Sequence, residues 1–219
     1  MRHFAFELDE LKNKLLKMGG MVESSLHLSV RSLVERDEAL ARKVLDGEAA
    51  INQMEMDVDQ MCTRLLVLQQ PVARDLRFLT AVLKTNTDLE RMGDLASNLA
   101  SRAISLIKMP PLKLNIDIPH MSSLVESMLL KSLDAFVKED ADLANEVLHS
   151  DDEVDRIRGA SYGEIIGYMR ENPADVPAGV ELIFVVRNLE RIGDHATNMA
   201  EDVIFMTKGI DVRHHSKVS

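Results

Sequence analysis

The chain has little cysteine, few aromatic residues and no long apolar run. Its single cysteine, Cys62, excludes an internal disulfide and a zinc site built from cysteines, and we expect it to be a small core residue. Tryptophan is absent, so the core must come from aliphatic side chains and 13 methionines, which is typical of helix bundles. No apolar stretch approaches the roughly 18 residues of a membrane span, and no signal peptide opens the chain. We therefore expect a cytoplasmic protein that meets membranes only through partners.

The charge of the chain also excludes a class of ligand. A formal net charge of −10 argues against nucleic acid as the main partner and favours cations or proteins with basic patches. Apolar residues make up 46% of the 219 positions, which is enough for one large or two small cores.

A ten-residue segment recurs one hundred positions apart. Residues 89–98 read LERMGDLASN, and residues 189–198 read LERIGDHATN. Weaker matches at an offset of 103 extend this similarity upstream, so the chain is an internal repeat. Two prolines near residue 110 stop a helix. We predict a first repeat over residues 1–109 and a second over 110–219, the second ending in a short polar tail.

Apolar residues in each repeat recur every three or four positions, which predicts helices. No segment alternates with the period of a strand. The predicted fold is therefore all-α, with two tandem three-helix bundles. Asp37 is expected to cap the second helix, Leu76 to point inward, and Gly19 and Gly20 to interrupt the first helix softly. The expected helices cover residues 4–36, 37–69, 74–108, 119–138, 140–170 and 177–208.

Pairs of carboxylates within the repeated segment indicate a cation site. Glu90 and Asp94 are four residues apart and project from one helix face, as do Glu190 and Asp194. Like charges at this spacing repel one another. A hard cation would offset the repulsion, because such ions prefer several oxygen ligands.

Each neighbouring helix carries a second polar pair at a matching height. In the first repeat, Glu48 and Asn52 are placed symmetrically to Asp94 and Glu90 about Pro71, where the hairpin turns.

In the second repeat, Asp151 and Asp155 are placed symmetrically to Asp194 and Glu190 about the Asn172–Pro173 bond. The pairs in each repeat should therefore lie at one height, although this register does not decide whether they face each other.

Other interpretations of these residues stay open. Each carboxylate pair is also compatible with a solvated helix face, and Gly93 and Gly193 fit close helix packing. Arg91 is expected to pair with the nearby carboxylates, and His195 to lie on the surface because Leu95 is its counterpart. The sequence shows no phosphate-binding loop, no nucleophile with a base and no di-iron Glu-x-x-His pattern, so it predicts no enzyme.

The repeated LER[MI]GD segment resembles the PhoU family of bacterial phosphate-signalling proteins. Residues 17–23, KMGGMVE, and 70–77, QPVARDLR, support the resemblance, which covers about residues 5–213. It implies two three-helix bundles that form a homodimer. It also implies repression of the phosphate-starvation response by coupling the Pst phosphate transporter, through its PstB-type ATPase, to the PhoR sensor kinase, with modulation of phosphate uptake.

The resemblance further implies metal ions, either iron, zinc or magnesium, bound by the paired carboxylates. The first set is one charge short because Asn52 replaces a carboxylate. The alternative function is a metalloenzyme or metal store that uses the same side chains. The residues implied as ligands are Glu48, Asn52, Glu90, Asp94, Asp151, Asp155, Glu190 and Asp194.

Overall fold

The computed structural model describes residues 2–114 and 116–212, and this part of the chain contains helices and no strand. The elements are α1 (Arg2–Val34), α2 (Glu38–Gln69), α3 (Ala73–Ile107), α4 (Ile118–Lys138), α5 (Ala141–Glu171), the short 3-10 helix η1 (Pro173–Asp175) and α6 (Val176–Lys208). The predicted all-α class is confirmed. The expected polar tail lies outside the described residues from position 213 onward.

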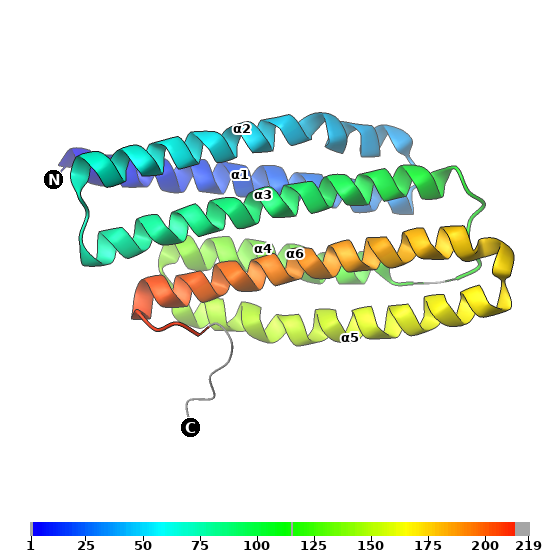
Figure 1. Cartoon of the computed structure of the whole chain (residues 1–219). Coiled ribbons are helices and arrows are strands. Elements are labelled where there is room, and N and C mark those ends of the chain that lie inside the picture. The colour runs from blue at the N-terminus through cyan, green and yellow to red at the C-terminus, as the bar shows by residue number, and fades with distance from the viewer. Residues whose placement is uncertain (1, 115, 213–219) are drawn as a thin grey trace, which may run out of the picture.

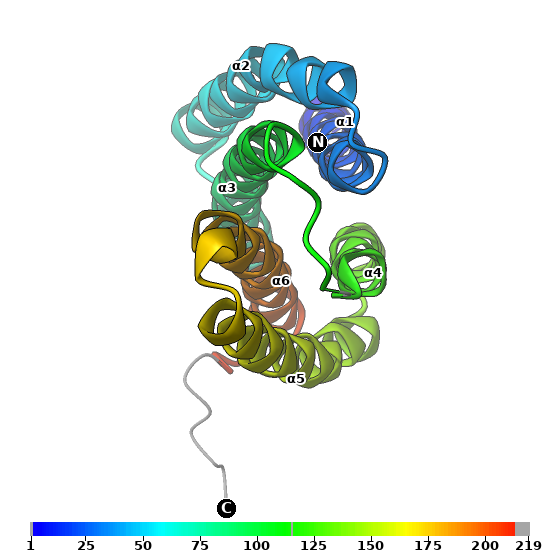
Figure 2. The ribbon, with the colours of Figure 1, turned by 90° about the vertical axis from the view of Figure 1, so that its right-hand side faces the viewer.

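The helices run along one long axis and form two groups of three (Figure 1). Seen from the end, α1–α3 form one group and α4–α6 the other, and α3 and α6 lie side by side between them (Figure 2). One apolar core extends through both groups. The helices that carry the repeated segment therefore form the main contact between the two repeats, and α1 and α4 form a smaller one.

Capping side chains explain where α2 and α5 begin. Asp37 accepts hydrogen bonds from the backbone N–H groups of Ala39 and Leu40, at 2.8 and 3.4 Å. Asp140 caps α5 in the same way. These bonds satisfy N–H groups that have no partner within the helix. The predicted cap at Asp37 is confirmed.

Two expectations about helix detail are wrong. Helix α1 continues through Gly19 and Gly20 without a break. Gly19 instead allows close packing, since a Cβ there would lie 2.4 Å from Leu133 Cδ1 of α4. Leu76 lies in the first turn of α3, at the hairpin end of the bundle, and is 44% exposed. Periodicity identifies a helix face but not the point where the neighbouring helices stop covering it.

Cys62 is a core residue, as expected, and is fully buried in α2. Burial raises the pKa of its thiol to about 12, and the charge of Asp59 adds to the rise. The thiol therefore stays protonated near neutral pH. None of the helices in residues 2–114 and 116–212 combines the length and apolarity needed to cross a membrane.

Candidate metal centres

The second repeat brings its four predicted carboxylates together. Asp151 and Asp155 lie on α5, and Glu190 and Asp194 lie on α6. Burial raises the pKa of Asp151 to about 6, and the charges of Asp194, Asp155 and Glu190 raise it further. The register predicted from the hairpin therefore places these side chains within electrostatic reach of one another.

Glu190 and Asp194 show the same crowding from the side of α6. Burial raises the pKa of Glu190, and the charge of Asp194 adds to the rise. Burial also raises the pKa of Asp194, followed by the charge of Asp155. The cluster carries more negative charge than its own surroundings neutralise, which favours a bound cation.

Arg158 is a member of this cluster that the sequence analysis missed. Its guanidinium donates to Glu190 Oε1 at 2.5 Å and lies 3.2 Å from Asp155 Oδ1. Its pairing with Asp155 was readable from the sequence, because Arg158 follows Asp155 by three residues and shares a helix face with it. Its contact with Glu190 depends on how α5 is rotated against α6. The arginine partly neutralises the second set.

The first repeat differs in its charges. Burial raises the pKa of Glu90, and Asp94 and Glu55 raise it further, whereas Arg91 opposes the rise. Arg91 lies 3.5 Å from Glu90 and 3.8 Å from Asp94, so the expected ion pairing is confirmed. Glu48 lies on α2 and is partly exposed.

Glu55 occupies the position in the first repeat that Arg158 occupies in the second. The first set thus gains a carboxylate and the second an arginine. Counting charge over the predicted positions alone made the first set weaker because of Asn52. With these neighbours included, that ranking no longer follows.

Asn52 provides a separate reason to expect a ligand at the first set. Its Oδ1 atom is buried and accepts no hydrogen bond from the described residues. A buried oxygen without a donor is costly unless a water or an ion satisfies it. The amide oxygen is a suitable ligand for a hard cation.

The side chains as they stand do not form a finished coordination sphere. Within the described residues, no group of three or more His, Cys, Asp or Glu side chains is close enough to hold a metal ion. The donor chemistry, the crowded carboxylates and the unsatisfied Asn52 oxygen nevertheless fit a cation. Metal binding at these positions therefore stays a prediction.

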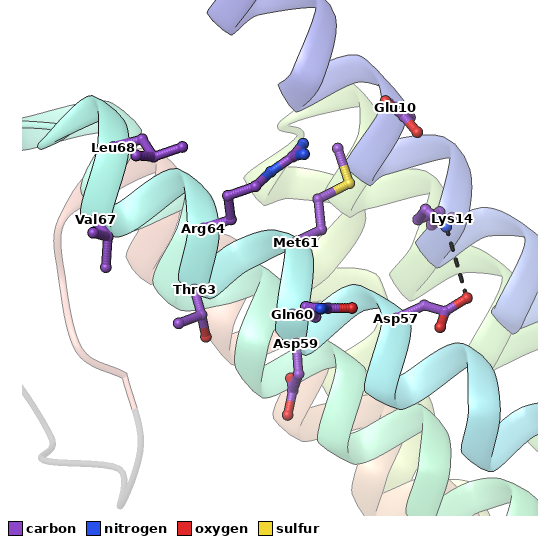
Figure 3. A pocket seen from close by; sticks show the side chains of 10 residues that line it. All are labelled: Glu10, Lys14, Asp57, Asp59, Gln60, Met61, Thr63, Arg64, Val67 and Leu68. Carbon is purple, nitrogen blue, oxygen red and sulfur yellow. Dashed lines mark ion pairs between the residues drawn. The ribbon is translucent and has the colours of Figure 1, made fainter.

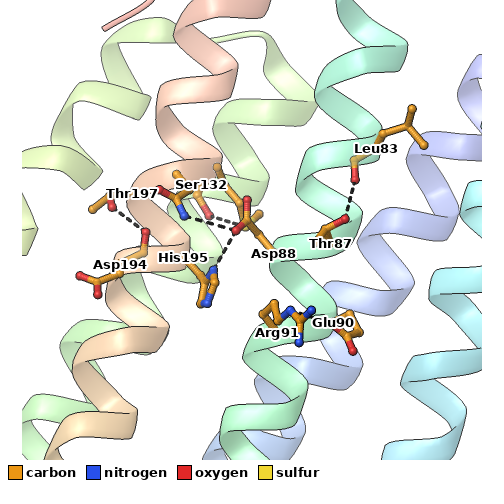
Figure 4. Close-up of polar contacts among 11 residues, drawn as sticks. Leu83, Thr87, Asp88, Glu90, Arg91, Ser132, Asp194, His195 and Thr197 are labelled. Atoms are coloured by element: carbon orange, nitrogen blue, oxygen red, sulfur yellow. Dashed lines mark hydrogen bonds and ion pairs between the residues drawn. The ribbon is translucent and has the colours of Figure 1, made fainter. Parts of the chain in front are cut away.

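His195 lies in the interface between the repeats and not on the surface as expected. Its Nδ1 atom is 2.8 Å from Asp88 Oδ1, and the two side chains are only 17% and 14% exposed. Figure 4 shows His195 turned toward Asp88 on α3, while Asp194 points to the other side of α6. The counterpart of His195 is buried Leu95, which was a signal that this position faces inward.

Further polar contacts join α3 to α6. Lys84 Nζ donates to Asp202 Oδ1 at 2.7 Å, and Arg102 lies 3.3 Å from Glu181. Asn198 of α6 also donates to Asp88 of α3, at 3.4 Å. The repeats are thus joined by polar pairs as well as by the core.

A surface hollow of about 800 Å³ lies between α1 and α2, away from both sets (Figure 3). Its lining includes the Lys14–Asp57 ion pair at 3.9 Å and the exposed side chains of Val67 and Leu68. None of the eight predicted ligands lines it.

The two repeated glycines provide a test of the packing interpretation. A Cβ on Gly93 would lie 3.1 Å from Ile51 Cγ2, whereas one on Gly193 would meet Val154 Cγ1 at an ordinary 3.6 Å. Alanine is favoured over glycine in helices by about 1 kcal/mol. We expect Gly193→Ala to stabilise the protein by about 0.5–1 kcal/mol in urea unfolding, and Gly93→Ala to gain less because Ile51 must shift.

Ile51→Val provides the matched control, because the second repeat has Val154 at the equivalent position. Combined with Gly93→Ala, it should recover part of the stabilisation expected from alanine, because the smaller valine side chain leaves room for the new Cβ. Equal destabilisation by both alanines would contradict the packing explanation.

Comparison with known proteins identifies related chains over nearly the whole length. A family model described as PhoU domain matches residues 15–103 and 118–203. A relative from Pseudomonas aeruginosa, named phosphate-specific transport system accessory protein PhoU homolog, is 41% identical over 97% of this chain and 88% of its own. The corresponding Escherichia coli protein is 32% identical over 96% of this chain and 88% of its own.

Solved structures agree with these matches. The crystal structure of PhoU from Pseudomonas aeruginosa superposes with a TM-score of 0.92 at 40% identity, covering 94% of this chain and all of that one. The phosphate transport system regulatory protein PhoU from Streptococcus pneumoniae gives 0.89 at 30% identity, covering 95% and 99%.

Proposed function

Because the chain belongs to the PhoU family, we propose that it is a negative regulator of the phosphate-starvation response that also modulates phosphate uptake. In this role it couples a Pst-type phosphate ABC transporter to a PhoR-type sensor histidine kinase. The observation that carries the proposal is the family match over both repeats, in relatives named as accessory proteins of phosphate transport.

The proposed partners are the PstB-type ATPase, the kinase and a second copy of this chain, all met in the cytoplasm. The net charge of −10 supports docking to basic patches on such partners. The proposed role is that of an accessory protein without catalysis.

We further propose that the two carboxylate sets bind divalent or trivalent metal ions. Glu90, Asp94 and Asn52 are the best-supported ligands in the first repeat, with Glu55 beside them. A cation there would neutralise crowded carboxylates and hold α2 against α3. The corresponding set on α5 and α6 would hold those helices together in the same way.

Deletion of the gene tests the regulatory proposal. Cells that lack the protein should express a phosphate-starvation reporter while phosphate is abundant, and the native gene should restore repression. Normal repression in the deletion strain would contradict the proposal. It would leave the alternative of a metal store or metalloenzyme, which redox activity of the metal-loaded protein would reveal.

A second strain should carry Asp94→Ala together with Asp194→Ala. Loss of repression by a folded double variant would link the metal sites to signalling. Full repression by a folded, metal-free variant would keep the regulatory role and remove that link.

A further inference from the structure

The most exposed apolar side chains of the described residues gather at one end of the bundle. The four most exposed large apolar side chains are Phe6, Val67, Leu68 and Val72, at 65, 68, 68 and 75% exposure. Phe6 lies near the start of α1, Val67 and Leu68 in the last turn of α2, and Val72 in the turn before α3. Figure 1 shows these helix ends together, with the α2–α3 turn extending beyond the end of α6. We call these four side chains, with Leu76 in the first turn of α3, the apolar end.

Polar contacts hold the helices of the apolar end in place. Glu7 of α1 accepts hydrogen bonds from Arg64 and Gln69 of α2, at 2.9 and 3.5 Å. Arg74, at the start of α3, pairs with Glu139 in the turn between α4 and α5. The exposed apolar side chains are therefore carried on a fixed frame.

The fold does not require apolar side chains at this end. Val67 and Leu68 correspond to Arg170 and Glu171 of the second repeat, and each pair lies in the last turn of its helix. A polar pair therefore serves the same place in the hairpin. Contiguous apolar patches that stay exposed mark contacts with another protein or with a membrane.

The shape of the apolar end favours a membrane over a protein segment. The hollow beside Val67 and Leu68 (Figure 3) is not an apolar groove, because most of its lining is polar, including Glu10, Asp57 and Gln60. The apolar side chains instead lie at the tip of a helical hairpin. Binding at a lipid interface needs buried apolar area and basic side chains, and it needs no complementary cleft.

Two arginines beside the apolar side chains are suited to lipid phosphates. The side chains of Arg64 and Arg74 are 54% and 73% exposed. Each donates to its carboxylate through one terminal nitrogen, so other guanidinium N–H groups remain available. Guanidinium groups bind phosphate oxygens through paired N–H donors, and phospholipid headgroups carry a phosphate. Asp75 is the only acidic residue between positions 64 and 77.

The net charge of −10 does not prevent this contact. Charges at a surface are screened over roughly 8–10 Å at physiological salt. Glu90 lies in the middle of α3, about 25 Å from the apolar end at the rise of a helix. When the bundle stands end-on, the carboxylates in its middle are therefore too far away to repel a lipid surface.

We propose that the apolar end is a contact surface for a phospholipid membrane, which the bundle meets end-on. The α2–α3 turn enters the headgroup region, and Arg64 and Arg74 bind phosphates beside it. The apolar area is small, so the attachment is weak and reversible, as it is for a single acyl chain. The inference does not rest on the metal sites or on the proposed regulatory role. It adds a direct membrane contact to any contact made through a protein partner.

Co-sedimentation with vesicles of phosphatidylethanolamine and phosphatidylglycerol tests the surface, in chelator so that no metal bridges carboxylates to lipid. The native full chain should bind with an association constant on the order of 10⁴ M⁻¹. Val67→Arg with Leu68→Glu installs the pair that the second repeat carries and leaves the net charge unchanged. This double variant should bind roughly tenfold more weakly, because two apolar side chains no longer enter the lipid.

Val34→Arg with Val180→Glu is the matched control, because both valines are exposed at the opposite end of the bundle. It makes the same chemical change and should leave vesicle binding at the native level. Both double variants should melt close to the native temperature, since all four side chains are exposed. An equal loss of binding in the two variants would overturn the proposal. A native chain that does not bind vesicles would also overturn it and leave the apolar end to a protein partner.

A fluorescent side chain checks the end-on orientation. The native chain contains no tryptophan, so a single introduced one reports only its own surroundings. Val72→Trp places it in the α2–α3 turn, and Val34→Trp places it at the opposite end. Vesicles should shift the emission of Val72→Trp to shorter wavelength and leave that of Val34→Trp unchanged. A shift at both positions, or at neither, contradicts the end-on contact.

Discussion

Added metal ion should raise the melting temperature of the native protein and leave an Asp94→Asn, Asp194→Asn double variant unchanged. A ligand that binds only the folded state stabilises it by about 2.7 kcal/mol at a concentration one hundred times its dissociation constant. For a chain of this size, that corresponds to a rise of roughly 5–10 °C. Thermal unfolding followed by circular dichroism, with iron, zinc and magnesium tested separately, measures the effect.

Without metal, the order of stability between the native protein and the double variant should be reversed. Burial and then the charge of Asp155 raise the pKa of Asp194, so its charged form is less favourable in the folded protein than in the unfolded one. Asparagine removes that charge and keeps the shape. The double variant should therefore be the more stable protein in chelator and the less stable one in metal.

Asp152→Asn serves as the control for the loss of a negative charge, because Asp152 is a neighbour of the cluster on α5 and not one of its predicted ligands. It should keep the response to metal. If none of the three metals changes the melting temperature of the native protein, that result contradicts metal binding at both sets.

The second large effect concerns pH and Asp151. Its pKa is raised from 3.8 to about 6 in the folded protein. A raised carboxyl pKa gives stability that is present below the unfolded value and is lost as pH rises through the folded value. This contribution to the free energy of unfolding is at most about 3 kcal/mol, and solvent screening of the half-buried side chain makes it smaller.

Asp151→Asn isolates this contribution. In chelator, the variant should unfold with a larger free energy than the native protein above about pH 7, and the difference should disappear below about pH 4. Urea unfolding across this range measures it. If the difference in free energy of unfolding between variant and native protein does not change with pH, Asp151 does not titrate in this window. With metal bound at neutral pH, the native protein should instead be the more stable of the two.

The sequence determined the fold class because helical periodicity and proline positions are local signals. Pro71 and the Asn172–Pro173 bond mark both hairpin turns. Their positions predict that Asp151 lies level with Asp194, and in the structure the two carboxylates are within electrostatic reach. The relative height of two residues on antiparallel helices depends only on the turn, which is why this part of the site was predictable.

The rotation of each helix about its axis was decided only by packing between helices. It brought Arg158 onto Glu190 and placed Glu55 beside Glu90, which changed the charge of both sets.

The contact between the repeats was likewise a matter of tertiary structure. His195 and Asp88 are 107 residues apart, and no local pattern joins them. Gly19 could be read from the sequence only as a flexible point, whereas its role depends on Leu133 of another helix. The sequence by itself determined which residues form helices, where the hairpins turn and which carboxylates share a height. Only the tertiary structure decided which side chains face each other, because that depends on how side chains from distant parts of the chain fill a shared space.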